Sequence, residues 1–548
     1  MAEGKVALPR SVHLFPLLAV LFLVSAAGNA LNVDVSKPGA TLIIQGPHAG
    51  CALGAPTSIT RTISDVPTDF SNGRTIAVGD LNGDGVGDLI VGAPFYGDNH
   101  QGAVYVIFGK NKWPAAQTID LATTTPGLAF YGGNAGEYVG HTVAAGDFNG
   151  DHIDDLMIGA PGAQGASLAH AGRVYIIYGS THFTLGTKKT LSSSKADYTI
   201  LGQEANQGVG FALAAGDFNH NGRDDCAAGG PYLGAGCGKV FVQFGRDYDK
   251  HAVLDLALHY ADVEILGIYN NDPSLLMGMS VAAGDISGDN RDDLAITAGL
   301  DPRSDMDDGT GAQTVTGAVY SFRGHTLVFE SGVTYDLSLY FAPYEIYGAS
   351  YMDCIGLSLA LGDVNGDGRA DFVLGSPKMS NSSGHVMVVY SPESPSNPWL
   401  RNLAAHDPGL DLTISYSDAQ LGYSCATGDL DHDGYADLLV GAPYADPLGR
   451  SNAGEVTLLV PTHNFNPKSS HLALNLSSIY PRRRYQGKTG SRLGTSVALG
   501  DVNGDGNCDV IMAAPYADPH SRTDAGEVYL FLAPGPQGVE RSVWSLYK

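Results

Sequence analysis

The stretch DVNGDGRADFVLGSP, residues 363–377, decides how this chain is expected to fold. Close copies of it begin at six other aspartates: Asp80, Asp147, Asp217, Asp285, Asp429 and Asp501. Seven copies of one unit indicate a repeat protein. In each copy, oxygen-bearing side chains stand at positions 1, 3, 5 and 9; in the quoted copy they are Asp363, Asn365, Asp367 and Asp371.

This spacing predicts a loop wrapped around a calcium ion. Calcium takes about six to eight oxygen ligands, and a tight loop with glycine near its centre can turn alternate side chains and one backbone carbonyl inward. Position 7, which is Arg369 in the quoted copy, would supply the carbonyl. We therefore expect calcium as the cofactor, with up to seven ions bound, one for each copy.

An EF-hand loop starts with the same residues, but it needs a glutamate at position 12 and a helix on each side. In this chain, position 12 is always apolar: Val91, Ile158, Ala228, Ile296, Leu374, Val440 and Met512. Runs such as DLIVGAP (88–94) follow the copies and runs such as SVALGD (496–501) precede them. Both kinds of run are typical of short buried strands. Each calcium loop is therefore expected to join two β-strands.

Two further strands are predicted in each repeat. A third lies in runs such as GAVYVIFG (102–109), and a fourth, outer strand lies in pieces such as LAFYG (128–132). Four antiparallel strands describe one propeller blade, so the chain is predicted to be an all-β, seven-bladed β-propeller with a calcium loop in each blade. The segment TLIIQG (41–46) resembles the fourth-strand pieces but precedes the first loop. We expect it to close the last blade, because closure removes an edge that invites aggregation.

The charge and the N-terminus limit the function classes. The 548 residues carry a formal charge of −26, which argues against nucleic acid and anionic membranes as partners. Lys5 and Arg10 precede an apolar run (14–24) and a small-residue stretch (25–30), the three parts of a signal peptide. We expect residues 1–30 to be removed and residues 31–548 to form a single secreted domain. No later apolar run reaches the ~20 residues that a membrane span needs.

Secretion also affects how cysteines and asparagines are interpreted. Six cysteines in a secreted chain permit disulfides, and Cys226 and Cys237, which flank the turn after the third loop, are the preferred pair. The other four cysteines are not assigned. Asn381 and Asn475 begin N-x-S sequons, so a glycoprotein is expected.

A glycine, a strand of small residues, the DxNxDGxxD loop and a GAP tripeptide together resemble the FG-GAP repeat of integrin α-subunit propellers. The same repeat occurs in the C-terminal half of GPI-specific phospholipase D. The resemblance implies calcium loops on one face of the ring and longer, variable loops on the other. It also implies the calcium ligands, residue by residue. These are Asp80, Asn82, Asp84 and Asp88; Asp147, Asn149, Asp151 and Asp155; Asp217, Asn219, Asn221 and Asp225; Asp285, Ser287, Asp289 and Asp293; Asp363, Asn365, Asp367 and Asp371; Asp429, Asp431, Asp433 and Asp437; and Asp501, Asn503, Asp505 and Asp509.

Three repeats depart from the pattern. Position 6 of the second copy is His152, which reduces the freedom of the turn. Position 5 of the third copy is Asn221, so we expect that loop to bind calcium most weakly. The fourth repeat reads TAGLDP where others read GAP.

The expected function is that of an extracellular adhesion module that binds a protein or a glycan, like the head of an integrin α subunit. We expect no enzyme activity and assign no catalytic residue, because the serine of the GMSVA-like runs (278–282, 356–360, 422–426 and 494–498) recurs in four repeats. Two alternatives stay open. One is a non-catalytic propeller partner of a GPI-specific phospholipase D-like enzyme, and the other is a polysaccharide-active propeller enzyme. The oligomeric state is not predicted.

Overall fold

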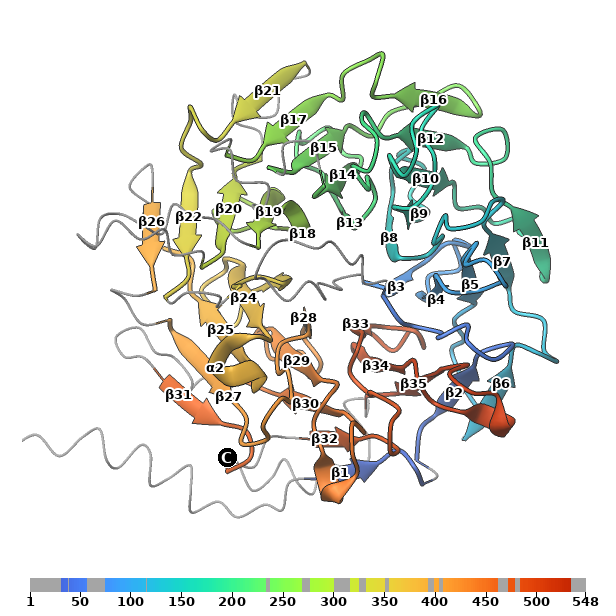
Figure 1. Ribbon diagram of the computed structural model, residues 1–548, viewed down its shortest axis with the longest axis vertical. Coiled ribbons are helices and arrows are strands. Elements are labelled where there is room, and N and C mark those ends of the chain that lie inside the picture. Colours follow the sequence, from blue (N-terminus) through green and yellow to red (C-terminus); the bar gives the residue numbers. More distant parts are fainter. Residues whose placement is uncertain are drawn as a thin grey trace, which may run out of the picture.

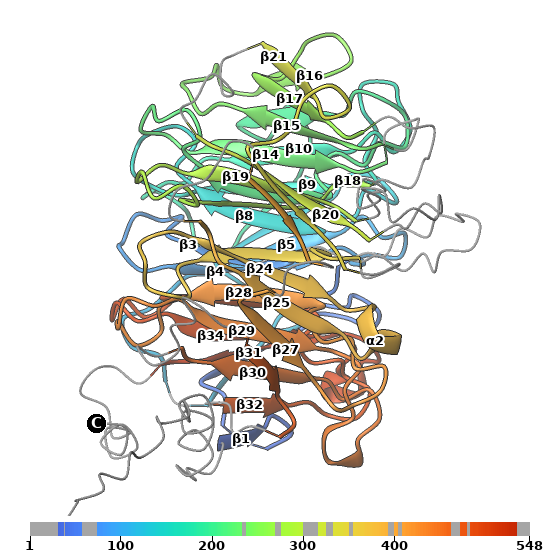
Figure 2. The same cartoon turned by 90° about the vertical axis from the view of Figure 1, so that its left-hand side faces the viewer.

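Seven β-sheets are arranged around a central axis in the computed structural model (Figure 1). Figure 2 shows the same ring turned by 90°, with the sheets seen one above another. The structure describes residues 31–37, 39–56, 74–114, 116–232, 237–268, 276–299, 316–324, 332–349, 354–392, 399–403, 408–461, 472–478 and 483–533. The expected signal peptide lies outside these residues. The chain is a seven-bladed β-propeller, as the sequence predicted.

Each blade is a sheet of five strands, named below in order from the axis outward. Blade 1 contains β3 (Ile76–Gly79), β4 (Asp88–Ala93), β5 (Ala103–Ile107), β7 (Leu128–Tyr131) and β11 (Thr187–Thr190). Blade 2 contains β8 (Thr142–Gly146), β9 (Asp155–Ala160), β10 (Arg173–Ile177), β12 (Tyr198–Leu201) and β16 (Ala252–Asp255). Blade 3 contains β13 (Ala212–Gly216), β14 (Asp225–Gly230), β15 (Lys239–Gln243), β17 (Val263–Leu266) and β21 (Val333–Asp336). Blade 4 contains β18 (Met277–Gly284), β19 (Asp293–Ala298), β20 (Ala318–Phe322), β22 (Tyr344–Tyr347) and β26 (Trp399–Asn402).

The remaining blades follow the same plan. Blade 5 contains β23 (Ser358–Gly362), β24 (Asp371–Ser376), β25 (His385–Val389), β27 (Leu410–Thr413) and β31 (Leu472–Asn475). Blade 6 contains β28 (Ser424–Gly428), β29 (Asp437–Ala442), β30 (Glu455–Leu459), β32 (Arg483–Gln486) and β1 (Leu31–Asp34). Blade 7 contains β33 (Val497–Gly500), β34 (Asp509–Ala514), β35 (Glu527–Phe531), β2 (Leu42–Gln45) and β6 (Gln117–Asp120). Among the described residues, the short elements α2 (Met379–Ser382), η3 (Pro447–Gly449) and η5 (Pro519–Ser521) are the helices, and no helix is long and apolar enough to cross a membrane.

The prediction of four antiparallel strands per blade was one strand short. The fifth strand pairs in parallel with the fourth, as β11 does with β7 in blade 1. In sequence, β11 lies between β10 and β12, which both belong to blade 2. The outermost strand of one blade therefore comes from the part of the chain that forms the next blade. These strands have only four residues, and their side chains alternate between partial burial and exposure, as in TKKT of β11. Their hydrophobic pattern is therefore too weak to be distinguished from a loop.

The apolar core lies between neighbouring sheets. The second strand of each blade is buried along its whole length, as in β4 and β9. Ile90 and Val104 of blade 1 belong to the same apolar cluster as Leu156 and Tyr175 of blade 2. Each sheet is therefore stabilised by its two neighbours, which makes the closed ring the stable unit.

A glycine stands seven residues before the first aspartate of each loop, and Gly140, which precedes Asp147, lies where two blades approach one another. Gly140 has φ of +83°, and a Cβ on it would lie 2.5 Å from the carbonyl oxygen of Ala103 in the preceding blade. An L-amino acid at this position would be strained by the positive φ, and its Cβ would clash with the neighbouring carbonyl oxygen.

The ring closes through two strands from the start of the described chain. The 41–46 segment contains β2, which pairs antiparallel with β35 as the fourth strand of blade 7, with Leu42 opposite Leu530. Just before it, β1 pairs in parallel with β32 of blade 6, with Leu31 opposite Arg483. The N-terminal segment therefore joins two blades rather than one.

The preferred disulfide between Cys226 and Cys237 is not present. In the hairpin of β14 and β15, Cys226 lies opposite Gln243, whereas Cys237 precedes β15 at the other end of the hairpin. The two residues flank the turn in sequence, but the strand register separates them. All six cysteines lie in the described part of the chain, and Cys226 and Cys237 are free thiols there.

Candidate calcium loops

The seven acidic loops occupy one position in every blade. We number them loop 1 (80–88), loop 2 (147–155), loop 3 (217–225), loop 4 (285–293), loop 5 (363–371), loop 6 (429–437) and loop 7 (501–509). In each loop, position 1 directly follows the innermost strand and position 9 is the first residue of the second strand. The elements on both sides are strands, as the apolar position 12 predicted.

Position 1 shapes every loop by accepting backbone hydrogen bonds. In loop 1, one carboxylate oxygen of Asp80 accepts the N–H of Asp84 at 3.1 Å and the other accepts the N–H of Gly85 at 2.8 Å. The N–H groups at positions 5 and 6 make the same two bonds in all seven loops. The loops therefore hold their turn through local Asx-type bonds, with position 1 on the inside of the turn.

Position 9 ties each loop to its blade. Asp88 is fully buried; one of its oxygens accepts the N–H of Gly109 after the third strand at 2.9 Å, and the other accepts the N–H of Leu81 at 3.1 Å. Burial raises the pKa of this carboxyl to about 7, and it raises the pKa of Asp155 and Asp225 to about 8. A nearby cation would favour the ionised carboxylate over the protonated one.

The carboxylates converge most closely in loop 6. Single oxygens of Asp429, Asp431 and Asp433 lie within 4.8 Å of one another, and among the described residues this is the one cluster of at least three acidic, histidine or cysteine side chains with such spacing. Loop 6 is also the copy with aspartate at position 3, where the others have asparagine or serine. An amide or hydroxyl oxygen could still serve as a calcium ligand in those loops.

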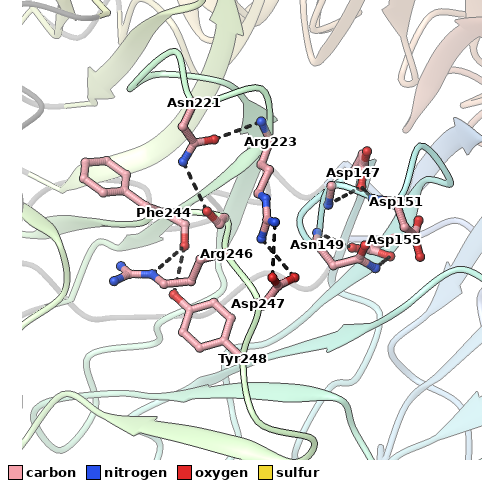
Figure 3. Close-up of polar contacts among 12 residues, drawn as sticks. Asp147, Asn149, Asp151, Asp155, Asn221, Arg223, Phe244, Arg246, Asp247 and Tyr248 are labelled. Atoms are coloured by element: carbon pink, nitrogen blue, oxygen red, sulfur yellow. Dashed lines mark hydrogen bonds and ion pairs between the residues drawn. The ribbon is translucent and has the colours of Figure 1, made fainter.

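Loop 3 uses its position 5 residue differently from the other loops (Figure 3). The amide nitrogen of Asn221 donates to the carbonyl of Gly245 at 3.2 Å, while its oxygen accepts the N–H of Arg223 at 2.9 Å. The Arg223 side chain extends across to Asp247, 3.2 Å away. Asn221 thus satisfies local hydrogen bonds without a carboxylate.

Loop 5 contains an ion pair that was not predicted from the sequence. The guanidinium of Arg369 at position 7 lies 3.2 Å from a carboxylate oxygen of Asp367 at position 5, and both side chains are mostly buried. The same carboxylate is a predicted calcium ligand. A cation entering loop 5 would therefore have to compete with the arginine for it.

Neighbouring loops are bonded to one another around the ring. The N–H of Asp154, at position 8 of loop 2, donates to the carbonyl of Asp80 at 3.1 Å, and the Asp154 carboxylate accepts the N–H of Asp80 at 2.8 Å. Asp224 makes the same two contacts with Asp147 of loop 2. These position 8 acids were not predicted from the sequence, although consecutive aspartates at positions 8 and 9 mark them. Loops 1, 2 and 3 are therefore coupled to one another through their backbones and the position 8 carboxylates.

The fold and the repeated loop define the class of this protein as a propeller built from seven copies of one unit. The chain is an FG-GAP repeat protein. The FG-GAP repeat model matches residues 72–107, 139–177, 277–322, 355–386, 421–459 and 493–531. These ranges omit blade 3, whose loop contains Asn221.

The relatives belong to two groups. Phosphatidylinositol-glycan-specific phospholipase D of Bos taurus is 27% identical over 428 residues, which is 74% of this chain and 47% of the relative. The Homo sapiens protein of the same name is 30% identical over 416 residues, 72% of this chain and 45% of the relative. Integrin alpha-PS2 of Drosophila melanogaster is 35% identical over 185 residues, 32% of this chain and 11% of the relative. The chain therefore spans less than half the length of each of these relatives.

Proposed function

We propose that this chain is an extracellular calcium-binding β-propeller that binds a protein or a glycan, as an integrin-like adhesion module. One observation carries the proposal. All seven loops have the same position 1 carboxylate geometry, and all seven connect the first two strands at the same end of their blades. This leaves the hairpins between second and third strands, at the opposite end, to vary in sequence and bind a partner.

In each loop, calcium would be held by the side chains at positions 1, 3, 5 and 9 and by the backbone carbonyl of position 7. Bound calcium would neutralise carboxylates that otherwise repel one another across a face with four acidic residues in loop 6 alone. Extracellular location is supported by the signal-peptide pattern of residues 1–30. We propose no catalytic role, since the inner-strand hydroxyls of Ser358 and Ser424 donate to the carbonyls of Gly422 and Gly494, both at 2.8 Å.

A second candidate function is that of a non-catalytic partner of a GPI-specific phospholipase D-like enzyme. It is favoured by the length of the match, because the phospholipase relative aligns over 428 residues and the integrin over 185. Nothing specific favours the third possibility from sequence, a polysaccharide-active enzyme.

The test is affinity capture from native extracellular fluid with the tagged full chain, run in parallel in calcium and in chelator. Calcium-dependent recovery of a receptor or glycoprotein supports the adhesion module. Recovery of a chain with GPI-cleaving activity supports the second candidate. Equal recovery with and without calcium, together with the absence of bound calcium by mass spectrometry, would reject the proposal.

A further inference from the structure

Loop 3 has an asparagine where the other six loops have an aspartate. Position 5 of loop 3 is Asn221, and the residue after it is Gly222. In the other loops position 5 is Asp84, Asp151, Asp289, Asp367, Asp433 and Asp505. An asparagine followed by glycine loses its side-chain amide readily, because the glycine nitrogen can attack the amide carbon without hindrance from a Cβ. The residue that departs from the pattern is therefore also a chemically reactive one.

The turn of loop 3 holds the reacting groups beside one another. The side-chain oxygen of Asn221 accepts the N–H of Arg223 at 2.9 Å, so the amide group folds back over the backbone of Gly222 (Figure 3). The N–H of Gly222 donates to a carboxylate oxygen of Asp217 at 2.8 Å. This carboxylate is placed to accept the proton that the Gly222 nitrogen must lose when it attacks.

This part of loop 3 is also open to water. Asn221 and Gly222 are both exposed, and a Cβ placed on Gly222 would meet none of the described residues within 4 Å. The amide nitrogen of Asn221 donates to a neutral partner, the carbonyl of Gly245, at 3.2 Å. Water can therefore reach the amide, and the backbone has room to bend as a ring closes.

The other Asn-Gly pairs of the described residues are held more tightly. They stand at positions 3 and 4 of loops 1, 2, 5 and 7, and their asparagines are buried or half-buried. Each amide nitrogen donates to the buried position 9 carboxylate of its own loop at 3.1 to 3.4 Å. A Cβ on each following glycine would lie 3.1 Å or less from a residue of another blade. Charge and packing therefore both oppose loss of the amide at Asn82, Asn149, Asn365 and Asn503.

An aspartate fits the turn that Asn221 occupies. Loop 5 has aspartate, glycine and arginine at the same three positions, and there the Asp367 carboxylate accepts the N–H of Arg369 at 3.1 Å. A carboxylate at residue 221 would turn an oxygen, in place of the amide nitrogen, toward the Gly245 carbonyl. Two such oxygens repel each other, and a cation between them would offset that repulsion.

We propose that Asn221 is a deamidation site, and that the aspartate formed there gives loop 3 the ligands of the other loops and raises its affinity for calcium. The Gly222 nitrogen bonds to the Asn221 amide carbon, the bond from that carbon to the amide nitrogen breaks, and ammonia leaves with the proton taken from Gly222. Water then opens the succinimide ring. Cleavage at the side-chain carbon gives aspartate, and cleavage at the backbone carbon gives isoaspartate.

The net change is hydrolysis of one amide by one water molecule, without oxidation or reduction. The deamidation itself is independent of the function proposed above, whereas its effect on calcium affinity rests on that function.

The test is peptide mapping by mass spectrometry of the full chain, incubated in buffer with and without urea. In the folded chain, Asn221 should lose its amide about tenfold faster than Asn82 or Asn503, because those amides must first break a charge-assisted hydrogen bond. In urea the sites should react at similar rates, since all share the Asn-Gly sequence. Asn221→Gln, which retains an amide but does not form the succinimide ring, should remove the product at this position alone.

The effect on calcium is tested with Asn221→Asp, which reproduces the aspartate product. In native mass spectrometry at calcium concentrations that leave loop 3 of the fresh wild type empty, this variant should bind one more ion than the wild type. Asn206→Asp adds the same charge at an exposed residue between β12 and β13, outside the loops, and should bind no more ions than the wild type.

Equal rates at all the Asn-Gly pairs of the folded chain would overturn the proposed site, as would an unreacted Asn221 at a time when the unfolded chain has lost its amides. Equal ion counts for Asn221→Asp and Asn206→Asp would overturn the effect on calcium affinity. A wild type that binds no calcium at all would reject the proposed function, and the peptide map would still decide whether Asn221 reacts.

Discussion

Arg450 donates two hydrogen bonds to the carboxylate of Asp34, although the two residues are 416 positions apart in the sequence. The guanidinium nitrogens of Arg450, in the hairpin between β29 and β30, lie 2.7 and 2.6 Å from the two carboxylate oxygens at the end of β1. Arg522, in the matching hairpin of blade 7, binds Asp120 at the end of β6 at 3.1 and 2.7 Å. A bidentate arginine thus fixes the outermost strand in both blades where the ring closes.

Arg450→Met should lower the free energy of unfolding by about 1–2 kcal/mol, since it removes a charged pair that is mostly screened from solvent. Urea denaturation in saturating calcium measures the change. Arg522→Met should have a similar effect through Asp120. The matched control is Lys37→Met, because Lys37 is 76% exposed, lies 4.0 Å from the same Asp34 carboxylate, and should contribute almost nothing. Equal losses for Arg450→Met and Lys37→Met would show that the bidentate geometry does not matter.

The Asp34 pair also predicts a pH dependence. The hydrogen bonds from Arg450 hold the pKa of Asp34 below its ordinary value of 3.8. A carboxyl whose pKa is lower in the folded state stabilises the fold above the unfolded pKa, and this contribution is lost as the pH falls through the folded pKa. The stability difference between wild type and Asp34→Asn should therefore be constant from about pH 5 to 7 and shrink below about pH 4. A difference that grew as the pH fell would contradict the assignment.

The loops should differ in calcium affinity according to how many carboxylates each loop offers and whether those carboxylates are already paired. Native mass spectrometry at rising calcium should approach seven ions, one for each loop, with loop 6 among the first to fill and loops 3 and 5 among the last. Arg369→Ala should strengthen loop 5, because it frees the Asp367 carboxylate. Arg223→Ala is the matched variant, since Arg223 pairs with Asp247 outside the loop and should leave the affinity of loop 3 nearly unchanged. A final count of three ions or fewer would rule out a site in every loop.

Features that repeat in register were predictable from sequence, whereas features that depend on which segments become neighbours were not. The loop spacing and the apolar position 12 identified the strand–loop–strand hairpin, because both are local. The fifth strands were missed because β1 and β11 pair with segments far along the chain and have weak patterns of their own. Asp154 was missed because its contact with Asp80 exists only when loops 1 and 2 lie side by side. The ion pair between Arg369 and Asp367 was missed because it depends on how loop 5 turns.

The role of glycine at position 4 of the loops could also not be predicted fully from the sequence. The sequence suggested only that the loops need flexible centres. In the structure, a Cβ on Gly150 would lie 2.7 Å from Nε of Arg223 in the next loop, and one on Gly288 would lie 2.7 Å from Cγ of Arg369. These glycines make room for the neighbouring blade, which no single repeat could reveal.

Ring closure and loop chemistry can be separated by two variants of blade 7. Deleting residues 42–46 removes β2, which pairs with β35 on one side and β6 on the other, so two strand edges lose their partners. Exposed edges and apolar side chains promote aggregation, and we expect low monomer yield at every calcium concentration. Asp505→Ala instead removes one carboxylate of loop 7, which accepts the Asn507 N–H at 2.9 Å.

The cost of Asp505→Ala should be local, and raising calcium should largely restore the yield, because occupancy lost through weaker binding returns at higher ion concentration. The yield of secreted monomer is measured for both variants over a calcium series. Lys110→Met, which replaces an exposed side chain, controls for losses during expression and purification. A deletion variant that calcium rescues as readily as Asp505→Ala would mean that β2 does not hold the ring closed. Failure of both variants at all calcium concentrations would mean instead that Asp505 is needed for folding of the hairpin itself, independently of any ion.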